Sequence, residues 1–254
     1  MATGDERVDI AVDDQHLAGT LIAARLCVPG VLFVHGWGGS QQQYIARARQ
    51  VAALGCVCLT FDLRGHAQTH AQYATVSRDD NLRDVLAAYD VLAKQPGVDT
   101  SAMAVVGSSY GGYLAAILTS LRPVKWLALR VPALYKDADW ELAKGQLKKH
   151  QDLDAYRRLP VLAEESRALR ACTKFGGDVL IVESEHDHVV PSQVIANYRD
   201  ACIHAHSLTY RVIEGADHGL SDEAWQHEYT SLLVSWLTEM LRNVRASERQ
   251  PAVG

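Results

Sequence analysis

Short apolar segments rich in β-branched residues alternate with helical patterns through most of the sequence, and this alternation constrains the fold more than any other feature. Turn residues bound each apolar segment, as is typical of buried strands. Because each helix that joins two parallel strands covers one face of their sheet, the alternation predicts an α/β fold, with a mostly parallel central sheet and helices on both faces. The expected strands are 31–36, 56–62, 103–108, 124–130, 178–184 and 208–213, and the expected helices are 41–54, 79–94, 110–121, 191–202 and 222–242.

Two segments lie outside this alternation. At the start of the chain, RVDIAV and LAGTLIAA flank the polar turn Asp13-Asp14-Gln15, which predicts an antiparallel hairpin at the edge of the sheet. After the sixth strand, the segment at about 132–176 is charged and helix-prone, which predicts a small helical insertion. Because loops at the carboxyl ends of strands surround the ligand crevice of an open α/β sheet, the insertion is placed to form a lid or a substrate wall. An ordinary crossover helix with short additions is the alternative.

The composition narrows the class of protein. With 48% hydrophobic and 22% charged residues and no linker-like stretch, residues 1–254 are expected to form one globular domain. A net charge of -5 argues against a nucleic-acid partner, which needs clustered Lys and Arg. No apolar stretch approaches the roughly 18 residues of a membrane span, and the acidic start MATGDERVDI is unlike a secretory signal. Five cysteines without a C-x-x-C pair favour neither disulfides nor zinc, so we expect a cytoplasmic protein.

A serine stands where an apolar strand pattern meets a helical one. The segment Gly107-Ser108-Ser109-Tyr110-Gly111 has the form G-x-S-x-G, which in a strand-to-helix turn exposes the central serine as a nucleophile. The next backbone N–H, from Tyr110, would lie at a helix N-terminus and could stabilise a developing oxyanion. The alternative is a turn serine that caps the helix, but the strand and helix on either side favour Ser109 as a nucleophile, and Ser108 as its inert neighbour.

A serine nucleophile needs a base, and the base needs a carboxylate to orient it. His218 follows the last expected strand, and Asp187 follows the strand before it. Asp217 is adjacent to His218, but neighbouring side chains in an extended loop diverge, so we expect Asp187 to be the acid. Asp137 and Asp139, one strand earlier, are a weaker alternative. The order Ser, Asp, His along the chain is that of α/β-hydrolases rather than of chymotrypsin or subtilisin.

Nearly the whole chain, from LAGTLIAA to SWLTEM, resembles the α/β-hydrolase superfamily, and in particular its small, esterase-type, dienelactone-hydrolase-like members. HGWGG, residues 35–39, resembles the oxyanion loop of that family, which implies that the Trp37 N–H is a second oxyanion donor beside Tyr110. FDLRGHAQT and HDHVVP resemble the turn after the following strand and the acid loop. Dienelactone hydrolases proper have a cysteine nucleophile where this chain has Ser109, so the resemblance implies a serine hydrolase without implying that specific activity.

Other candidate sites are weaker. The histidines at 186, 188, 204 and 206 have H-x-H spacings without a third clustered ligand, so no metal is expected. GWGG lacks the pattern of a phosphate or dinucleotide loop, so no cofactor is expected. His35 and His66 are expected to hydrogen-bond the backbone of their own loops. Tyr135 and Trp140 in the insertion are candidates for lining a substrate pocket, although aromatic residues on helices more often pack in the core.

These residues together predict a cofactor-independent serine hydrolase, a carboxylesterase that cleaves small acyl esters. Ser109 would attack the ester carbonyl, His218 would transfer the proton, and Asp187 would orient His218. An aminopeptidase or acyltransferase on the same scaffold is the alternative among enzymes, because fold and triad do not choose the leaving group or the acceptor. A noncatalytic α/β-hydrolase that only binds a small molecule is the alternative outside enzymes. The sequence leaves the natural substrate and the oligomeric state open.

Overall fold

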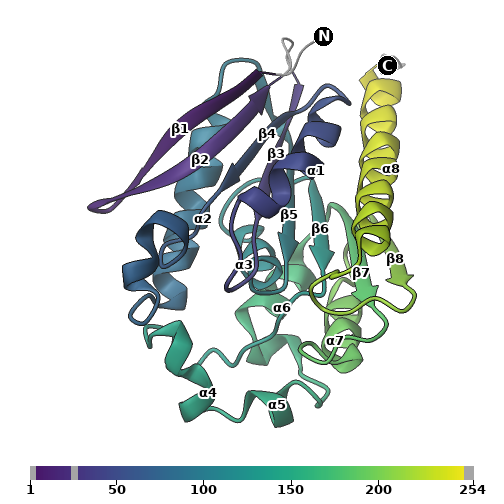
Figure 1. The fold of residues 1–254 in the computed structure, drawn as a ribbon. Helices are drawn as coiled ribbons and strands as arrows, with labels where there is room; N and C mark the ends of the chain where they lie inside the picture. Colours follow the sequence, from purple (N-terminus) through teal and green to yellow (C-terminus); the bar gives the residue numbers. More distant parts are fainter. Residues whose placement is uncertain (1–3, 24–27, 249–254) are drawn as a thin grey trace.

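The computed structural model describes residues 4–23 and 28–248, and these contain one eight-stranded sheet with the strand order β1-β2-β4-β3-β5-β6-β7-β8. Strands β3 to β8 pair in parallel, and the hairpin β1–β2 is antiparallel and pairs antiparallel with β4. The mostly parallel sheet and the hairpin at its edge are therefore confirmed (Figure 1). The strands are β1 Gly4–Val12, β2 Gln15–Ala23, β3 Val28–Val34, β4 Val57–Phe61, β5 Val98–Ser108, β6 Trp126–Arg130, β7 Asp178–Ser184 and β8 Ser207–Ile213.

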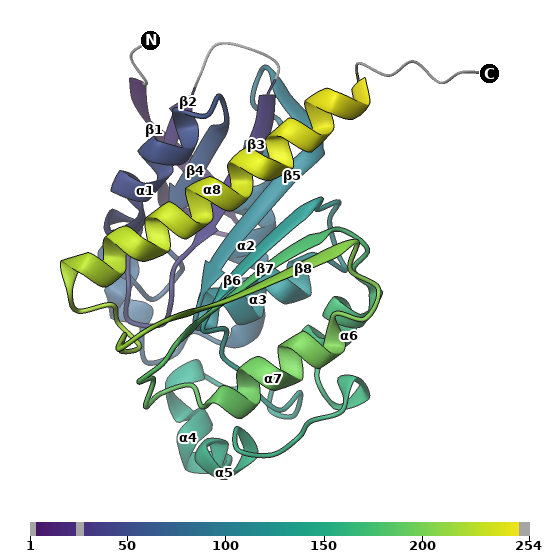
Figure 2. The ribbon, with the colours of Figure 1, turned by 90° about the vertical axis from the view of Figure 1, so that its right-hand side faces the viewer.

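Helices cover both faces of the sheet. Helices α1 and α8 pack on one face, as Figure 2 shows, and α2, α3, α6 and α7 pack on the other. Side chains of one strand alternate between the two resulting cores, so that Val105 belongs to one and Val106 to the other. The helices are α1 Gln42–Ala52, α2 Arg78–Ala93, α3 Tyr110–Leu118, α4 Leu147–His150, α5 Leu153–Tyr156, α6 Arg167–Lys174, α7 Ser192–Ala201 and α8 Glu223–Glu248.

The connection from β6 to β7 contains the expected helical insertion. It consists of two short 3-10 turns, Lys144–Gln146 and Ala163–Glu165, and the helices α4, α5 and α6. Helix α6 packs against α3 and α7 as a crossover helix. Figure 1 shows α4 and α5 beyond the carboxyl ends of the parallel strands, which is the edge where α/β folds bind ligands.

Strand β5 begins earlier than expected. Its first residues include Asp99 and Ser101, which are polar, and Ser101 is exposed, so a search for apolar runs starts the strand only at Met103. The pairing of β3 with β5 is also shifted between Pro29 and Gly30. Backbone pairing therefore extends the strand where the side chains give no apolar signal.

The cysteines that the structure describes, Cys56, Cys58, Cys172 and Cys202, are buried, and Cys27 lies outside the described residues. Cys56, immediately before β4, and Cys58, within it, belong to the same core. Within 4–23 and 28–248, no helix combines the length and the apolar character that crossing a bilayer requires.

Candidate active site

Ser109 occupies the turn between β5 and α3. Its φ of 52° lies in a region that residues with a side chain rarely adopt, so the turn is strained. Backbone hydrogen bonds hold it there: the Ser109 N–H donates to the Arg130 carbonyl (2.9 Å), and the Ser109 carbonyl accepts from Ala133 N–H (2.9 Å). A Cβ on Gly111 would lie 2.2 Å from the Val34 carbonyl oxygen, so only glycine fits at that position.

The imidazole of His218 connects Ser109 to Asp187. Its Nε2 lies 3.0 Å from Ser109 Oγ, and its Nδ1 lies 2.6 Å from Asp187 Oδ2. Because an ionised carboxylate only accepts hydrogen bonds, Nδ1 carries the proton, and Nε2 of the neutral ring is left to accept the serine hydroxyl proton. The Asp187 side chain is 3% exposed and that of His218 is 22% exposed. The structure thus brings together the three residues expected from the ends of β5, β7 and β8.

The carboxylate of Asp187 is held ionised by its partners. Its other oxygen, Oδ1, accepts the N–H groups of Val189 and Val190, each at 2.7 Å. Burial raises the pKa of Asp187, but the hydrogen bonds from His218 and from the two amides outweigh burial, so the net pKa lies below the usual value. The His186 N–H donates to the Ala216 carbonyl (2.8 Å), which ties the acid loop to the loop that carries His218.

The alternative acids have other partners. Asp217 accepts from the backbone N–H and the hydroxyl of Ser221, at 3.0 and 2.5 Å, and so stabilises the loop before α8. In the insertion, Asp137 pairs with Arg170 (2.7 Å), and Asp139 accepts from the Gln151 amide (3.0 Å). None of these three carboxylates bonds the His218 ring within the described residues.

The loop His35–Gly39 approaches Ser109 from the end of β3. A Cβ on Gly36 would lie 3.3 Å from Ser109 Cβ, so the two turns are in close contact. In the described part of the chain, the backbone N–H groups of Trp37 and Tyr110 donate no hydrogen bond to another residue. Both amides therefore remain available to an oxygen atom bound beside the serine.

Two histidines hold this loop in shape, and each also bonds the backbone of the other's loop. His35 Nδ1 donates to the Gly36 carbonyl (2.8 Å), and its Nε2 accepts from Leu63 N–H (3.0 Å). His66 Nε2 accepts from Gly38 N–H (3.0 Å). Burial lowers the pKa of His35 to about 4 and also lowers that of His66, so both rings are neutral at pH 7 and can accept these bonds.

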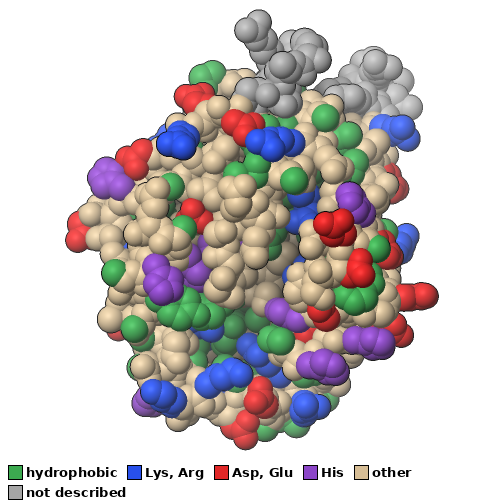
Figure 3. Space-filling model, in the orientation of Figure 1, with side chains coloured by type: hydrophobic (Ala, Val, Ile, Leu, Met, Phe, Trp, Pro, Cys, Tyr) green, Lys and Arg blue, Asp and Glu red, His purple; other side chains and the backbone are tan. Residues whose placement is uncertain are grey.

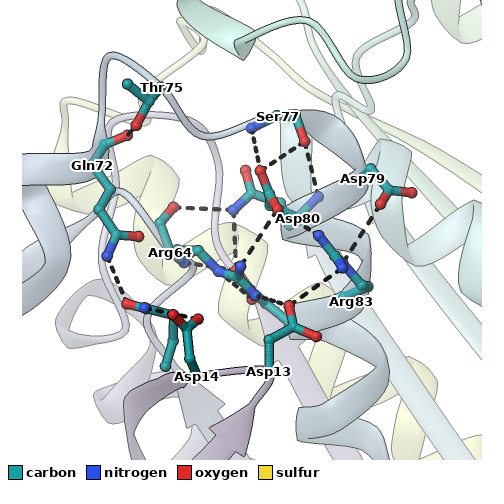
Figure 4. A network of polar contacts seen from close by, with 12 residues as sticks. Asp13, Asp14, Arg64, Gln72, Thr75, Ser77, Asp79, Asp80 and Arg83 are labelled. Atoms are coloured by element: carbon teal, nitrogen blue, oxygen red, sulfur yellow. Dashed lines mark hydrogen bonds and ion pairs between the residues drawn. The ribbon is translucent and has the colours of Figure 1, made fainter.

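An ion-pair network supports the turn that carries His66. Arg64 bonds the buried carboxylate of Asp84 through its N–H, Nε and Nη2, and its guanidinium also reaches Asp80 and Asp13 (Figure 4). Asp80 lies in the first turn of α2, where its carboxylate and Ser77 form a capping box. The network thus links the β1–β2 turn and the start of α2 to the loop that positions Gly38.

The cavity beside Ser109 has a volume of about 300 Å³. Trp37, Ser109 and His218 line it, and so do Arg47 and Arg130. Sequence reasoning did not select these two arginines. The available signal was that Arg130 ends an otherwise apolar strand at the edge where Ser109 also lies.

Tyr135 and Trp140 are not among the residues that line this cavity. Tyr135 is 3% exposed and packs edge-on against the rings of Tyr110 and Tyr113. The Trp140 indole N–H donates to Asp79 (2.8 Å) at the start of α2. Lys144, in the insertion, has its ammonium 4.5 Å from the centre of the Trp37 ring and 5.1 Å from that of the Tyr135 ring.

The fold is that of α/β-hydrolases of known structure. The dienelactone hydrolase of Anabaena variabilis superposes with a TM-score of 0.67 at 18% identity, covering 93% of this chain and 98% of that one. An esterase of Pyrococcus furiosus superposes with a TM-score of 0.69 at 19% identity, covering 93% and 91%. The acylaminoacyl peptidase of Pyrococcus horikoshii gives a TM-score of 0.70 at 16% identity, covering 93% of this chain but only 42% of the peptidase. At these identities the likeness establishes the fold alone.

No curated protein matches the sequence. Residues 42–244, which include Ser109, Asp187 and His218, match the prolyl oligopeptidase family. That match and the superpositions confirm the resemblance drawn from the motifs. The protein is a serine hydrolase of the α/β-hydrolase superfamily and belongs to the prolyl oligopeptidase family.

Proposed function

We propose that the protein is a carboxylesterase that cleaves small acyl esters through an acyl-enzyme on Ser109. The observation that carries the proposal is the position of the His218 ring, within hydrogen-bond distance of Ser109 Oγ on one side and of Asp187 on the other. This is the contact that a general base needs with a nucleophile and with the group that orients it.

In the proposed reaction, Ser109 Oγ attacks the ester carbonyl carbon as its proton passes to His218 Nε2. The carbonyl oxygen becomes an oxyanion that accepts the N–H groups of Trp37 and Tyr110. The carbon–oxygen bond to the alcohol then breaks, and the departing alcohol takes the proton from His218. A water molecule that loses its proton to His218 attacks the acyl-enzyme, and release of the acid restores the Ser109 hydroxyl.

The lining of the cavity supports an ester over a substrate with a free α-amino group. A cationic amine needs a carboxylate partner when it is bound out of water. The described residues that line the cavity include no Asp or Glu, and two of them are arginines. An aminopeptidase is therefore disfavoured on electrostatic grounds.

Membership of the prolyl oligopeptidase family supports a second candidate, a peptidase. The electrostatic argument restricts it to substrates whose amino end is blocked by an acyl group. A panel of 4-nitrophenyl esters beside acylated and free aminoacyl 4-nitroanilides separates the candidates, because the proposal expects esters to be cleaved with the highest kcat/KM. Higher kcat/KM on an acylated anilide would favour the peptidase.

Covalent labelling tests the role of Ser109 directly. A fluorophosphonate should label the wild type and Ser108→Ala but not Ser109→Ala, since only an activated hydroxyl reacts. Turnover of 4-nitrophenyl acetate should fall by about a millionfold in Ser109→Ala, as in other triad knockouts. The proposal fails if Ser109→Ala retains wild-type turnover in an uncontaminated preparation, and a noncatalytic binding protein is indicated if the wild type does not label.

A further inference from the structure

Two arginines from different elements meet at the wall of the cavity. Arg47 lies on α1, and Arg130 ends β6. The ring of Tyr229 on α8 lies between them, with its centre 4.5 Å from the Arg47 guanidinium carbon and 5.7 Å from that of Arg130. In Figure 3, Lys and Arg atoms are visible inside the furrow to the right of the centre. Both arginines are on the side of the sheet covered by α1 and α8, away from the insertion.

Each guanidinium is positioned by a neutral group. Arg130 Nη1 donates to the carbonyl of His218 (2.9 Å), and its Nε lies 3.4 Å from Ser108 Oγ. Arg47 Nε donates to the hydroxyl of Thr230 (3.1 Å). These bonds fix the two side chains beside the nucleophile and leave donor groups of each fork without a partner among the described residues.

No carboxylate lies within ion-pair distance of either arginine in residues 4–23 and 28–248, although the charge of Asp187 acts on Arg130. Neither Arg47 nor Arg130 forms an ion pair there. The buried Arg78 and Arg157 form none either, but their guanidinium groups donate to backbone carbonyls and do not line the cavity. Arg130 is only 7% exposed, although a buried charge is normally paired. Burial lowers the pKa of Arg130, and the positive charge of Arg47 acts in the same direction, whereas Tyr44, Tyr229 and the Asp187 carboxylate act in the opposite one.

We infer that Arg47 and Arg130 form an anion subsite that binds a carboxylate of the substrate a few bonds from the scissile carbonyl. The inference rests on the proposed function, since it names the class of ester that the same cavity accepts. A guanidinium pairs with a carboxylate through two parallel hydrogen bonds, and the carboxylate would accept from donor groups of Arg47 and Arg130 that have no partner among the described residues. The cavity volume of about 300 Å³ limits the distance between the carboxylate and the ester.

Matched substrates test the subsite. The mono(4-nitrophenyl) ester of adipic acid carries a carboxylate on the acyl half, and 4-acetoxybenzoate carries one on the leaving group. The methyl ester of each compound is its neutral counterpart. The ratio of kcat/KM for the anion to that for its methyl ester measures recognition of the carboxylate. We expect this ratio to exceed one for at least one of the two compounds, and that compound identifies the half of the ester that faces the arginines.

Variants of the full chain then identify the residues. Removing one charge-assisted hydrogen bond lowers affinity by roughly 10- to 100-fold, so Arg47→Gln should lower the ratio by about tenfold or more. Arg49→Gln is the matched control, because Arg49 is on the same helix but pairs with Asp5 at the surface, and its ratio should not change. Arg130→Gln should lower the ratio too, and it should also reduce cleavage of the neutral esters because the His218 carbonyl loses its donor. Circular dichroism of each variant checks the fold.

The outcomes separate the two proposals. Two results refute the subsite while the carboxylesterase stands, provided that the neutral esters are cleaved. In one, neither wild-type ratio exceeds one; in the other, the ratios are the same in Arg47→Gln as in the wild type. If no ester is cleaved, the proposed function fails, and titration calorimetry with monomethyl adipate decides the subsite alone. Binding that weakens in Arg47→Gln but not in Arg49→Gln supports it, and absence of binding overturns it.

Discussion

Replacement of Asp187 by asparagine is the most informative single perturbation of the site. Asp187 Oδ1 accepts two backbone N–H groups, so the asparagine carbonyl oxygen must occupy that position, and its NH2 group then points at His218 Nδ1. An NH2 group donates, which forces Nδ1 to accept and places the ring proton on Nε2, facing Ser109. The ring can then no longer take the hydroxyl proton.

The structure also sets the size of the expected effect. In a serine protease the same exchange lowers kcat about ten-thousandfold through the wrong tautomer, which corresponds to roughly 5 kcal/mol in the activation barrier. We expect a loss of that order for Asp187→Asn. Asp217→Asn is the control, because the Asp217 carboxylate bonds Ser221 in the neighbouring loop and does not bond the His218 ring, and the loss of activity should stay within about tenfold, the value of one hydrogen bond at the surface.

The assay is kcat on 4-nitrophenyl acetate at pH 8, with both variants purified in parallel and their folds compared by circular dichroism. A severe loss in Asp217→Asn together with near-normal turnover in Asp187→Asn would refute the assignment of the acid. Equal and severe losses in two folded variants would show that the tautomer argument is insufficient.

Three further predictions concern the oxyanion loop, the substrate and the buried histidine. Trp37→Ala should keep much of the activity because the backbone donates, whereas Trp37→Pro removes the donor and should lower kcat by about a hundredfold or more; equal effects would argue against this amide. Acetyl to butyryl esters should be cleaved with higher kcat/KM than long-chain esters, and a steady rise beyond octanoyl would indicate an acyl tunnel in the insertion. The pKa of His35 is about 4 in the folded protein, below its unfolded value of 6.5, so the unfolded state binds the proton first as the pH falls. The free energy of unfolding should therefore decrease between pH 6.5 and pH 4, by about 3 kcal/mol in all. Urea unfolding at pH 7 and at pH 4.5 measures this loss in the free energy of unfolding. The loss should be smaller in His35→Gln, and an equal loss in the wild type and in His35→Gln would contradict the prediction.

The residues that bond to one another around Ser109 could be predicted because each follows the carboxyl end of a strand. Ser109, Asp187 and His218 carry local signals, and parallel strands bring such ends to one edge of the sheet. The exclusion of Asp217 also followed from the local chain, since an aspartate next to the histidine points away from its ring.

The pair Arg47 and Arg130 could not be predicted in this way. One lies on a helix and the other on a strand, and they meet only because α1 and α8 pack over the same face, with Tyr229 between them. No periodicity in either segment indicates that contact. Tyr135 and Trp140 are candidates for the pocket because the sequence places them after β6. Their partners depend on packing, which sets Tyr135 against Tyr113 and Trp140 against Asp79.

The turns after β3 and β5 touch backbone to backbone, and this limits how the protein can diverge. A Cβ at Gly111 would overlap the carbonyl of Val34, and one at Gly36 would press on Ser109, so neither turn can gain a side chain or a residue without moving the other. Descendants of this sequence should therefore keep these turns nearly invariant. New substrate preferences would arise mainly in the β6–β7 connection, whose short helices tolerate changes of length without displacing the nucleophile.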